Sequence, residues 1–241
     1  MRKRADIVLV ERGFFVSRAR AQAAIAAGLV RVGGEPLRKP SDGIADGAAI
    51  EADLPHPYAS RGGMKLAAAL DAFALDPRGL VCLDVGASTG GFTDVLLERG
   101  AKIVVAVDVG RGQLDPRLTA DPRVRSLESL DARALSPEHF SEAPGAIVCD
   151  VSFISQRLVL PHVLSLAASP AWLVSLIKPQ FEVGRNEIVK GRVRSDEALG
   201  RACAEVRACV EAEGWTVLGI IPSPVLGGAG AREFLLAARH D

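Results

Sequence analysis

A glycine-rich segment with an acidic residue at its start is the first place where the sequence suggests chemistry. Leu83-Asp-Val-Gly-Ala-Ser-Thr-Gly-Gly-Phe-Thr follows an apolar run and opens a helical pattern. Its glycines permit a tight turn and let a ligand approach the backbone closely. The segment matches neither the phosphate-binding GxxxxGK[ST] pattern nor a strict GxGxxG, and Asp84 would repel a phosphate placed beside it. A ligand with cationic or hydroxyl groups is therefore favoured.

Further carboxylates follow in strand order. Asp108 ends the next apolar run, where a carboxylate can accept both ribose hydroxyls of an adenosine. Asp131 follows the next element, near where an adenine ring would lie. Each alone is more often a solvated or helix-capping carboxylate, but together with the glycine-rich segment they predict a nucleoside-cofactor pocket. The predicted cofactor-binding residues are Asp84, Gly86, Ser88, Gly90, Gly91, Phe92, Asp108, Asp131 and Asp150.

Positive charge gathers at the amino-terminal end. Lys+Arg and Asp+Glu are both 29 over the whole chain, yet residues 1–40 hold nine basic and three acidic residues. A charge run is usually a solvated helix face. Here Ser17 is a good N-cap, so two arginines fall at the start of a helix, where backbone N–H groups also favour phosphate. We expect RNA contacts from Arg4, Arg18, Arg20, Arg31, Lys39 and, at the exit of a linker, Arg61. Structured RNA is favoured because the segment lacks an aromatic platform for stacking bases.

These residues belong to two predicted units. Residues 4–50 read as two helices followed by short strands, with Gly28 as a helix stop and Gly33-Gly34 as a hairpin turn. Two prolines at 55–57 suit a short stiff linker. We therefore expect a small α+β domain over residues 1–55, a linker over 56–61 and a larger domain over 62–241.

In the larger domain, apolar strand-like runs alternate with helical patterns. The runs begin at residues 81, 103, 146, 171, 216 and 233, and helices are expected at 92–99 and 197–213. Such alternation predicts an α/β fold with a mostly parallel, doubly wound, Rossmann-like sheet. Several runs end in a polar residue, namely Asp84, Asp108, Asp150 and Lys178, and ligands bind at this carboxyl edge of open parallel sheets.

Composition excludes several other classes. Of the 241 residues 49% are apolar, without low-complexity tracts, which indicates a globular chain. The basic start is not followed by a long apolar stretch, and no run approaches the roughly 20 apolar residues of a membrane span. The four cysteines form no CxxC pair, which favours reduced thiols. We expect a cytoplasmic protein with no membrane association and no obligate protein partner.

Long motifs resemble the TlyA family, known both as hemolysins and as ribosomal RNA 2'-O-methyltransferases. The amino-terminal unit resembles the alpha-L (S-four-type) RNA-binding module through Arg4-Ala-Asp, Ser17-Arg and Lys39-Pro, among other positions. Ser60-Arg-Gly-Gly-Met-Lys-Leu, the glycine-rich segment, Cys149-Asp-Val-Ser-Phe-Ile-Ser and Ile177-Lys-Pro-Gln-Phe-Glu resemble FtsJ-like methyltransferases. The resemblance implies a class I methyltransferase that uses S-adenosylmethionine and acts on a cytidine ribose in ribosomal RNA, within ribosomal subunits.

The resemblance also implies a catalytic Lys-Asp-Lys-Glu set, matched here by Lys65, Asp150, Lys178 and Glu233. These residue types suit the chemistry, because a ribose hydroxyl is a poor nucleophile and gains from a nearby base or cation. We expect Lys178 to act as the base, with the carboxylates orienting the two lysines. No metal is expected, because no His/Cys cluster has ligand spacing.

Two positions depart from the family pattern: Ala231 replaces an expected Asn before Glu233, and Arg192-Val-Arg-Ser-Asp is irregular. Three other functions stay open. A hemolysin-like membrane-active protein is disfavoured because the sequence has no strongly amphipathic cationic helix. An RNA-binding ribosome assembly factor would tolerate loss of Lys178 or the loop glycines, which are present. A small-molecule methyltransferase would not need the basic amino-terminal unit.

Overall fold

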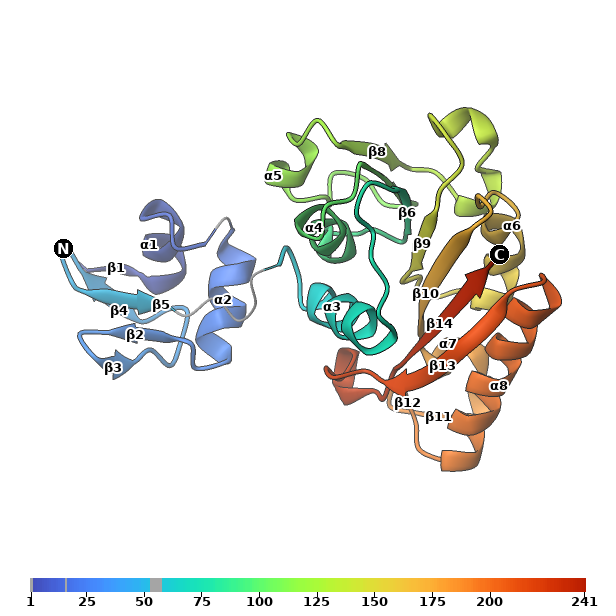
Figure 1. Ribbon diagram of the computed structural model, residues 1–241. Coiled ribbons are helices and arrows are strands. Elements are labelled where there is room, and N and C mark those ends of the chain that lie inside the picture. Colours follow the sequence, from blue (N-terminus) through green and yellow to red (C-terminus); the bar gives the residue numbers. More distant parts are fainter. Residues whose placement is uncertain (1, 16, 53–57) are drawn as a thin grey trace. The chain divides into compact units, whose positions relative to one another are not determined.

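The computed structural model describes residues 2–15, 17–52 and 58–241, which form two compact units, Met1–Pro57 and Tyr58–Asp241 (Figure 1). The predicted linker differs from this division. Residues 56 and 57 lie outside the described residues, as do 53–55 at the end of the predicted first domain. Residues 58–61 belong to the second unit, because Ala59 is buried and its N–H donates to Asp94 Oδ2 over 2.7 Å.

The first unit packs two helices against short strands. Its elements are β1 (Arg2–Arg4), α1 (Ala5–Glu11), α2 (Arg18–Ala26), β2 (Val30–Val32), β3 (Glu35–Pro36), β4 (Gly43–Ala45) and β5 (Ile50–Ala52). The Ser17 hydroxyl accepts a hydrogen bond from the Arg20 N–H and caps α2. Gly33 and Gly34 both have positive φ and join β2 to β3 in a tight antiparallel turn. Residues such as Leu9, Ile25 and Ile44 form its buried core.

The second unit is built on a seven-stranded sheet in the order β13-β14-β10-β9-β6-β7-β8. The strands are β6 (Val81–Val85), β7 (Ile103–Asp108), β8 (Val124–Glu128), β9 (Ala146–Cys149), β10 (Ala171–Ile177), β13 (Thr216–Pro222) and β14 (Phe234–His240). β14 runs antiparallel to both of its neighbours, and the other pairings are parallel. This sheet confirms the predicted Rossmann-like fold, although β8 is absent from the predicted runs because its sequence, VRSLE, is largely polar.

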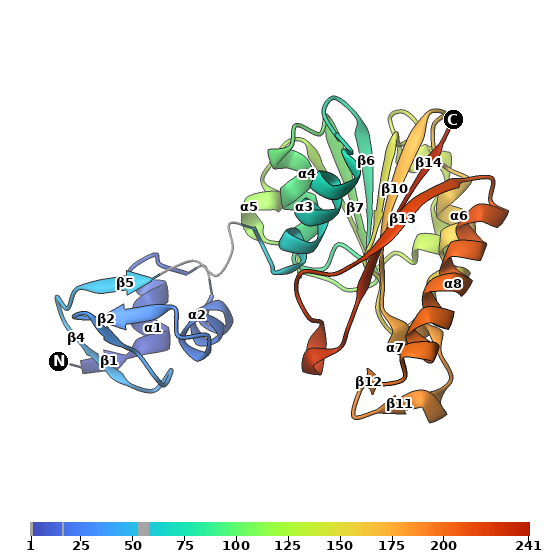
Figure 2. The same cartoon turned by 60° about the horizontal axis from the view of Figure 1, so that its bottom comes forward.

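Helices cover both faces of this sheet (Figure 2). α3 (Gly62–Phe73), α4 (Gly91–Glu98) and α5 (Pro116–Thr119) lie on one face, and α6 (Leu160–Leu164) and α8 (Asp196–Ala212) lie on the other. Two apolar clusters fill the layers, one including Leu66, Leu96 and Leu176 and the other including Ile147, Leu160 and Val206. No helix in the described part of the chain combines the length and apolar character needed to cross a membrane.

The carboxyl ends of the parallel strands meet at one edge of the sheet. β6 and β9 lie side by side there, and β10 follows β9. The chain leaves β10 through α7 (Pro179–Glu182) and a two-stranded hairpin, β11 (Ile188–Val189) and β12 (Arg192–Val193), before α8 begins. The residues that follow these strand ends are therefore brought close together.

Candidate functional site

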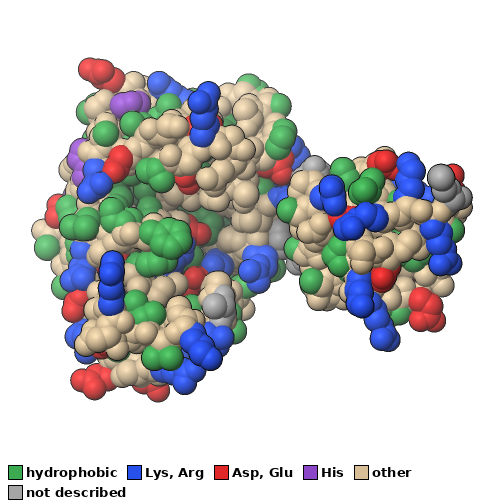
Figure 3. Space-filling view, turned by 180° about the vertical axis from the view of Figure 1, so that it is seen from behind, with side chains coloured by type: hydrophobic (Ala, Val, Ile, Leu, Met, Phe, Trp, Pro, Cys, Tyr) green, Lys and Arg blue, Asp and Glu red, His purple; other side chains and the backbone are tan. Residues whose placement is uncertain are grey.

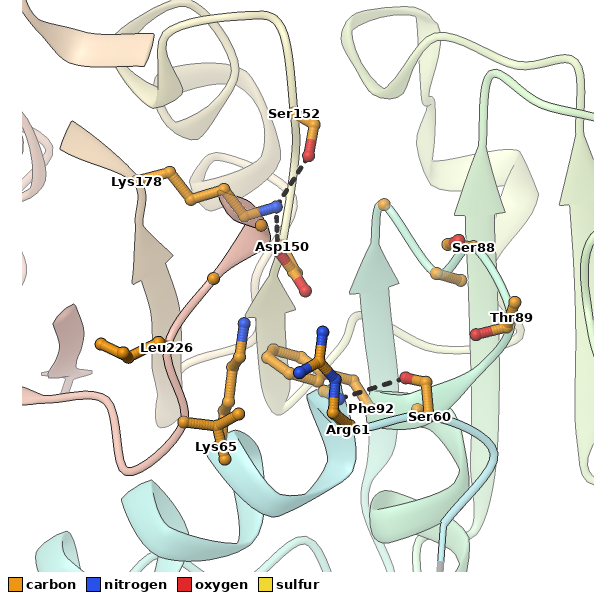
Figure 4. A pocket seen from close by; sticks show the side chains of 17 residues that line it. Ser60, Arg61, Lys65, Ser88, Thr89, Phe92, Asp150, Ser152, Lys178 and Leu226 are labelled. Carbon is orange, nitrogen blue, oxygen red and sulfur yellow. Dashed lines mark hydrogen bonds and ion pairs between the residues drawn. The ribbon is translucent and has the colours of Figure 1, made fainter. Parts of the chain in front are cut away.

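A cavity of about 300 Å³ opens at this edge of the sheet (Figure 4). It is bordered by the start of α3, the loop between β6 and α4, the ends of β9 and β10, and the loop before β14. Its lining residues are Ser60, Arg61, Gly62, Lys65, Gly86, Ala87, Ser88, Thr89, Gly91, Phe92, Asp150, Ser152, Lys178, Val225, Leu226, Gly227 and Gly228. Both predicted groups, for the cofactor and for catalysis, thus contribute to one cavity.

Two glycines let the chain pass closely over its neighbours beside this cavity. Gly86 has φ +83°, and a Cβ there would lie 2.6 Å from the Asp150 carbonyl oxygen. A Cβ on Gly91 would lie 2.1 Å from Ser60 Oγ. Larger residues would push apart the elements that border the cavity, so these positions require glycine for a physical reason.

Asp84 lies under the glycine-rich loop and is completely buried. Its Oδ2 accepts a hydrogen bond from Thr93 Oγ1 over 2.6 Å, whereas its Oδ1 has no hydrogen-bond partner among the described residues. Burial raises the pKa of Asp84 to about 7, against the opposing hydrogen bond from Thr93. A buried acceptor without a partner is costly, and a cationic or hydroxyl group of a ligand would satisfy it.

Asp108 and Asp131 occupy different surroundings. The Asp108 carboxylate accepts the Ser88 N–H over 2.8 Å and the Gly110 N–H over 2.7 Å, and it lines a second hollow of about 10 Å³. Asp131 caps a short 3-10 helix and pairs with Arg133 at 2.6 Å, which lowers the Asp131 pKa to about 2. Asp131 lies outside the linings of both hollows, as do Asp84 and Gly90, and the N–H of its neighbour Leu130 donates to the Asp108 carbonyl.

The first lysine–carboxylate pair joins the ends of β9 and β10. Lys178 Nζ lies 2.5 Å from Asp150 Oδ1 and donates a hydrogen bond to Ser152 Oγ over 2.7 Å (Figure 4). β9 and β10 are neighbouring parallel strands, so the residues that follow their carboxyl ends come close together. All three side chains line the cavity, so the pair faces a ligand directly.

The second pair joins α3 to the residue before β14. Lys65 Nζ lies 2.5 Å from Glu233 Oε2, and both residues are buried. Lys65 points from α3 toward Asp150 across the cavity (Figure 4), whereas Glu233 lies behind the lining. Gly227 is part of this arrangement, because a Cβ there would lie 2.0 Å from Glu233 Oε1. Ala231, which stands where the family pattern has Asn, is buried. Its backbone closes the same loop through hydrogen bonds with the backbones of Gly227 and Gly228.

A buried carboxylate outside the cavity, Glu182, links the segments that follow β9 and β10. Glu182, four residues after Lys178, accepts hydrogen bonds from Ser155 Oγ over 2.5 Å and from the Gln156 N–H over 2.8 Å. Gln156 in turn donates to the Leu176 carbonyl. The segment that carries Asp150 and the segment that carries Lys178 are therefore tied together at a second point.

The amino-terminal cations divide into two groups. Arg4 and Arg18 both pair with Asp6, which is fully buried, and Gln22 also donates to it. These donors hold the pKa of Asp6 far below its usual range, with Arg4 making the largest contribution. The two arginines thus also organise the unit internally, which the sequence pattern does not reveal.

The remaining predicted RNA-binding residues lie at or near the surface. Arg31 and Lys39 are exposed, with Arg31 donating to the Gly34 carbonyl, and Arg20 is partly buried at the start of α2. Arg61 belongs to the second unit, where it is exposed and lines the cavity.

Sequence reasoning missed several lining residues. Ser60 and Ser152 stand inside motifs that were recognised for their neighbours, and Thr89 lies within the glycine-rich segment. Val225, Leu226, Gly227 and Gly228 come from the loop before β14. The Gly227-Gly228 pair, six residues after a strand-like run, is the signal that could have pointed to that loop.

Comparisons with known proteins agree with this architecture. The model of the FtsJ-like methyltransferase family matches residues 58–240, and the S4 domain model matches residues 3–50. The chain is 44% identical over 241 residues to the Mycobacterium tuberculosis 16S/23S rRNA (cytidine-2'-O)-methyltransferase TlyA, covering 99% of this chain and 90% of that protein.

Solved structures extend the likeness to the fold. A hemolysin candidate from Streptococcus thermophilus is 40% identical, with a TM-score of 0.79 over 99% of this chain and 88% of that one. A Burkholderia thailandensis N1-methyltransferase solved with S-adenosylhomocysteine is 18% identical, with a TM-score of 0.52 over 76% of this chain and 78% of that one, and shares the fold. On the evidence of its full-length relatives and of its two matched domains, the chain belongs to the TlyA family of FtsJ-like methyltransferases.

Proposed function

We propose that this protein transfers a methyl group from S-adenosylmethionine to the ribose 2'-hydroxyl of a cytidine in ribosomal RNA. The observation that carries the proposal is the convergence of two lysine–carboxylate pairs on a cavity bordered by the glycine-rich loop. The Mycobacterium tuberculosis relative is named for this reaction. The named relatives that modify ribosomal RNA are bacterial, and bacteria assemble ribosomes in the cytoplasm, so we place the activity there.

The residues around the glycine-rich loop fit S-adenosylmethionine. Asp84 lies behind the cavity lining, with one carboxylate oxygen that has no partner among the described residues, and its charge favours a cationic ligand group nearby. Gly86 and Gly91 keep the loop close to Asp150 and Ser60, and Phe92 lines the cavity. Asp108 retains lone pairs for the ribose hydroxyls of a nucleoside. We leave Asp131 outside this proposed set because it is engaged with Arg133.

The proposed chemistry needs only a positioned proton acceptor. When bound, S-adenosylmethionine supplies a methyl carbon on a sulfonium, which is already a good leaving group. Lys178 first gives the proton of its ammonium to solvent. Its neutral Nζ then takes the proton of the substrate 2'-hydroxyl, and Asp150 and Ser152 hold the ammonium that forms. Lys65, oriented by Glu233, binds the ribose from the opposite side. Holding the hydroxyl in line with the methyl group supplies much of the remaining rate enhancement.

We assign substrate selection to the S4 domain at the amino terminus. Its exposed cations, Arg31 and Lys39 among them, suit a polyanion. Arg4 and Arg18 would bind RNA while they remain paired with Asp6. This division predicts that removing residues 1–57 leaves cofactor binding intact and abolishes methylation of RNA. Equal methylation by the truncated protein would rule out the targeting role.

The test is to incubate the protein with tritiated S-adenosylmethionine and ribosomal subunits, or naked ribosomal RNA, and to map the label. Label on a cytidine ribose that disappears with Lys178→Ala supports the proposal. Measured cofactor binding without label on any RNA would instead favour a small-molecule methyltransferase or an assembly factor. Lysis of erythrocytes by the purified wild type, unchanged in Lys178→Ala, would support the hemolysin alternative.

A further inference from the structure

The hairpin that follows Lys178 carries a group of positive charges that the proposed site does not use. Arg185, Lys190, Arg192 and Arg194 are all exposed on or beside β11 and β12. We call these four residues the hairpin cations. In Figure 3, Lys and Arg side chains gather at the lower end of this unit, on the face that also shows a hollow.

The hairpin cations have no carboxylate partner among the described residues, whereas eight of the thirteen other arginines of this unit have one. These eight are Arg99, Arg117, Arg123, Arg133, Arg157, Arg201, Arg207 and Arg232. The nearby carboxylates Glu187 and Asp196 pair with Arg201 and Arg232. Unpaired cations concentrated in ten residues produce a local positive potential that favours a polyanion.

The hairpin presents these charges on a fixed support. Val193 is buried between Arg192 and Arg194, in a small cluster with Ala198 and Leu199 of α8. Alternation along the strand therefore directs both arginines to the same, outer side. Lys190 stands at the turn with φ +50°, where glycine or asparagine is more usual. A strained lysine at an exposed turn is consistent with a use for its side chain.

The hairpin also adjoins the cavity. A Cβ on Gly230 would lie 3.5 Å from Arg192 Nη1, so this guanidinium lies beside the loop whose Gly227 and Gly228 line the cavity. On the other side, only α7 and a few residues separate Lys178 from Arg185. At least Arg192 therefore lies beside a segment that lines the cavity in which a substrate ribose would react.

We propose that the hairpin cations bind backbone phosphates of the substrate RNA beside the target nucleotide, as a second RNA-binding surface separate from the S4 domain. This inference rests on the proposed function for the nature of the substrate. Phosphate contacts of this kind fix the register of a nucleic acid without reading its sequence. A lipid surface is the less favoured polyanion, because Val189 is the only large hydrophobic exposed on the described hairpin.

The test compares two triple variants of the full chain that lose the same charge. The first is Lys190→Gln/Arg192→Gln/Arg194→Gln. The matched control is Arg78→Gln/Arg125→Gln/Arg239→Gln, with Arg78 before β6, Arg125 in β8, and Arg239 at the opposite end of β14 from Glu233. Binding to ribosomal RNA is measured over a series of NaCl concentrations, alongside S-adenosylmethionine binding and binding to phosphatidylglycerol vesicles.

We expect the hairpin variant to bind RNA about tenfold more weakly, and the slope of log K against log[NaCl] to fall by about 2. Cofactor binding should stay unchanged in both variants, and the control should keep the wild-type slope. A hairpin variant with wild-type RNA affinity, an equal loss in the control, or a loss confined to vesicle binding would overturn the inference. If the wild type methylates no RNA but the hairpin variant still loses RNA affinity, the proposed activity fails and the RNA-binding surface stands.

Discussion

The two lysine–carboxylate pairs of the site differ in how far solvent reaches them. In the pair of Lys65 and Glu233 the side chains are 10% and 3% exposed, and Glu233 does not line the cavity. In the pair of Lys178 and Asp150 they are 12% and 22% exposed, and Ser152 adds a second partner for the lysine. We call them the closed pair and the open pair. The difference suggests that the open pair exchanges a proton with the substrate, while the closed pair positions it.

Loss of the open-pair lysine should have the largest effect on catalysis. We expect Lys178→Met to lower the methylation rate by about 10³-fold, because general-base catalysis commonly contributes 10² to 10⁴-fold. Cofactor affinity should change little, which equilibrium binding of S-adenosylmethionine can check. Lys102→Met, which removes an exposed lysine paired with Glu142, is the control and should keep full activity. A Lys178→Met enzyme with wild-type rate would remove the open pair from the chemistry.

Loss of a carboxylate should affect stability more in the closed pair. Glu233→Ala leaves Lys65 buried without a partner, and we expect a loss of about 3 kcal/mol in the free energy of unfolding. Asp150→Ala leaves Lys178 with Ser152 and with water nearby, so we expect about 1 kcal/mol. Urea unfolding of both variants measures the difference. Lys65→Met/Glu233→Leu should recover most of the lost stability but not the activity. Equal losses in the two single variants would contradict the comparison.

The hydroxyl of Ser152 distinguishes the open pair from the closed one and should have a smaller effect. We expect Ser152→Ala to slow methylation about tenfold at saturating substrates, because one hydrogen bond to a charged group contributes about 1.4 kcal/mol or somewhat more. Ser152→Thr keeps the hydroxyl and should retain most of the rate. Steady-state kinetics with both variants is the measurement. An alanine variant that changes only KM would place Ser152 in substrate binding instead.

The pH dependence of cofactor binding should sharpen the comparison further. The pKa of Asp84 is raised to about 7 mainly by burial, with Asp150 also raising it. The charged carboxylate prefers a cationic ligand, so affinity should rise with pH through 7 and be about fivefold weaker at pH 6 than at pH 7. Asp84→Asn should abolish this dependence. Asp150→Asn should move it to lower pH, whereas Glu233→Gln should leave it in place.

The same raised pKa has a consequence for the free protein. Asp84 is protonated in the folded state and ionised in the unfolded state between its ordinary pKa of 3.8 and about 7. Its contribution to stability is therefore fully present below this window and is lost as the pH rises through it. Urea unfolding at several pH values should show this component in the wild type, and Asp84→Asn should lack it.

Local patterns predicted much of the fold and part of the site. Apolar runs that end in polar residues indicated the carboxyl edge of a parallel sheet, and the structure places Asp150 and Lys178 together there. The glycine-rich segment follows β6 and opens α4 as expected. Such features depend on short stretches of chain whose physical meaning is fixed by strand direction and turn geometry.

Features that depend on distant parts of the chain could not be predicted in this way. Lys65 and Glu233 are 168 residues apart, and only the family resemblance indicated that they act together. The loop at residues 225–228 has no apolar period, and its glycine pair indicates a turn without placing it over the cavity. Asp131 fits the spacing of a cofactor residue, and its ion pair with Arg133 could not be predicted from that spacing.

The most direct test of the distinction between the two pairs is a lysine-to-arginine exchange at each. Arginine keeps the positive charge but does not give up a proton at ordinary pH, so it can position a substrate and cannot act as a base. In single-turnover methylation of ribosomal RNA at saturating S-adenosylmethionine, we expect Lys178→Arg to be inactive and Lys65→Arg to retain activity within about tenfold of wild type. An active Lys178→Arg enzyme, or equal losses at the two positions, would contradict the assignment of the base to the open pair.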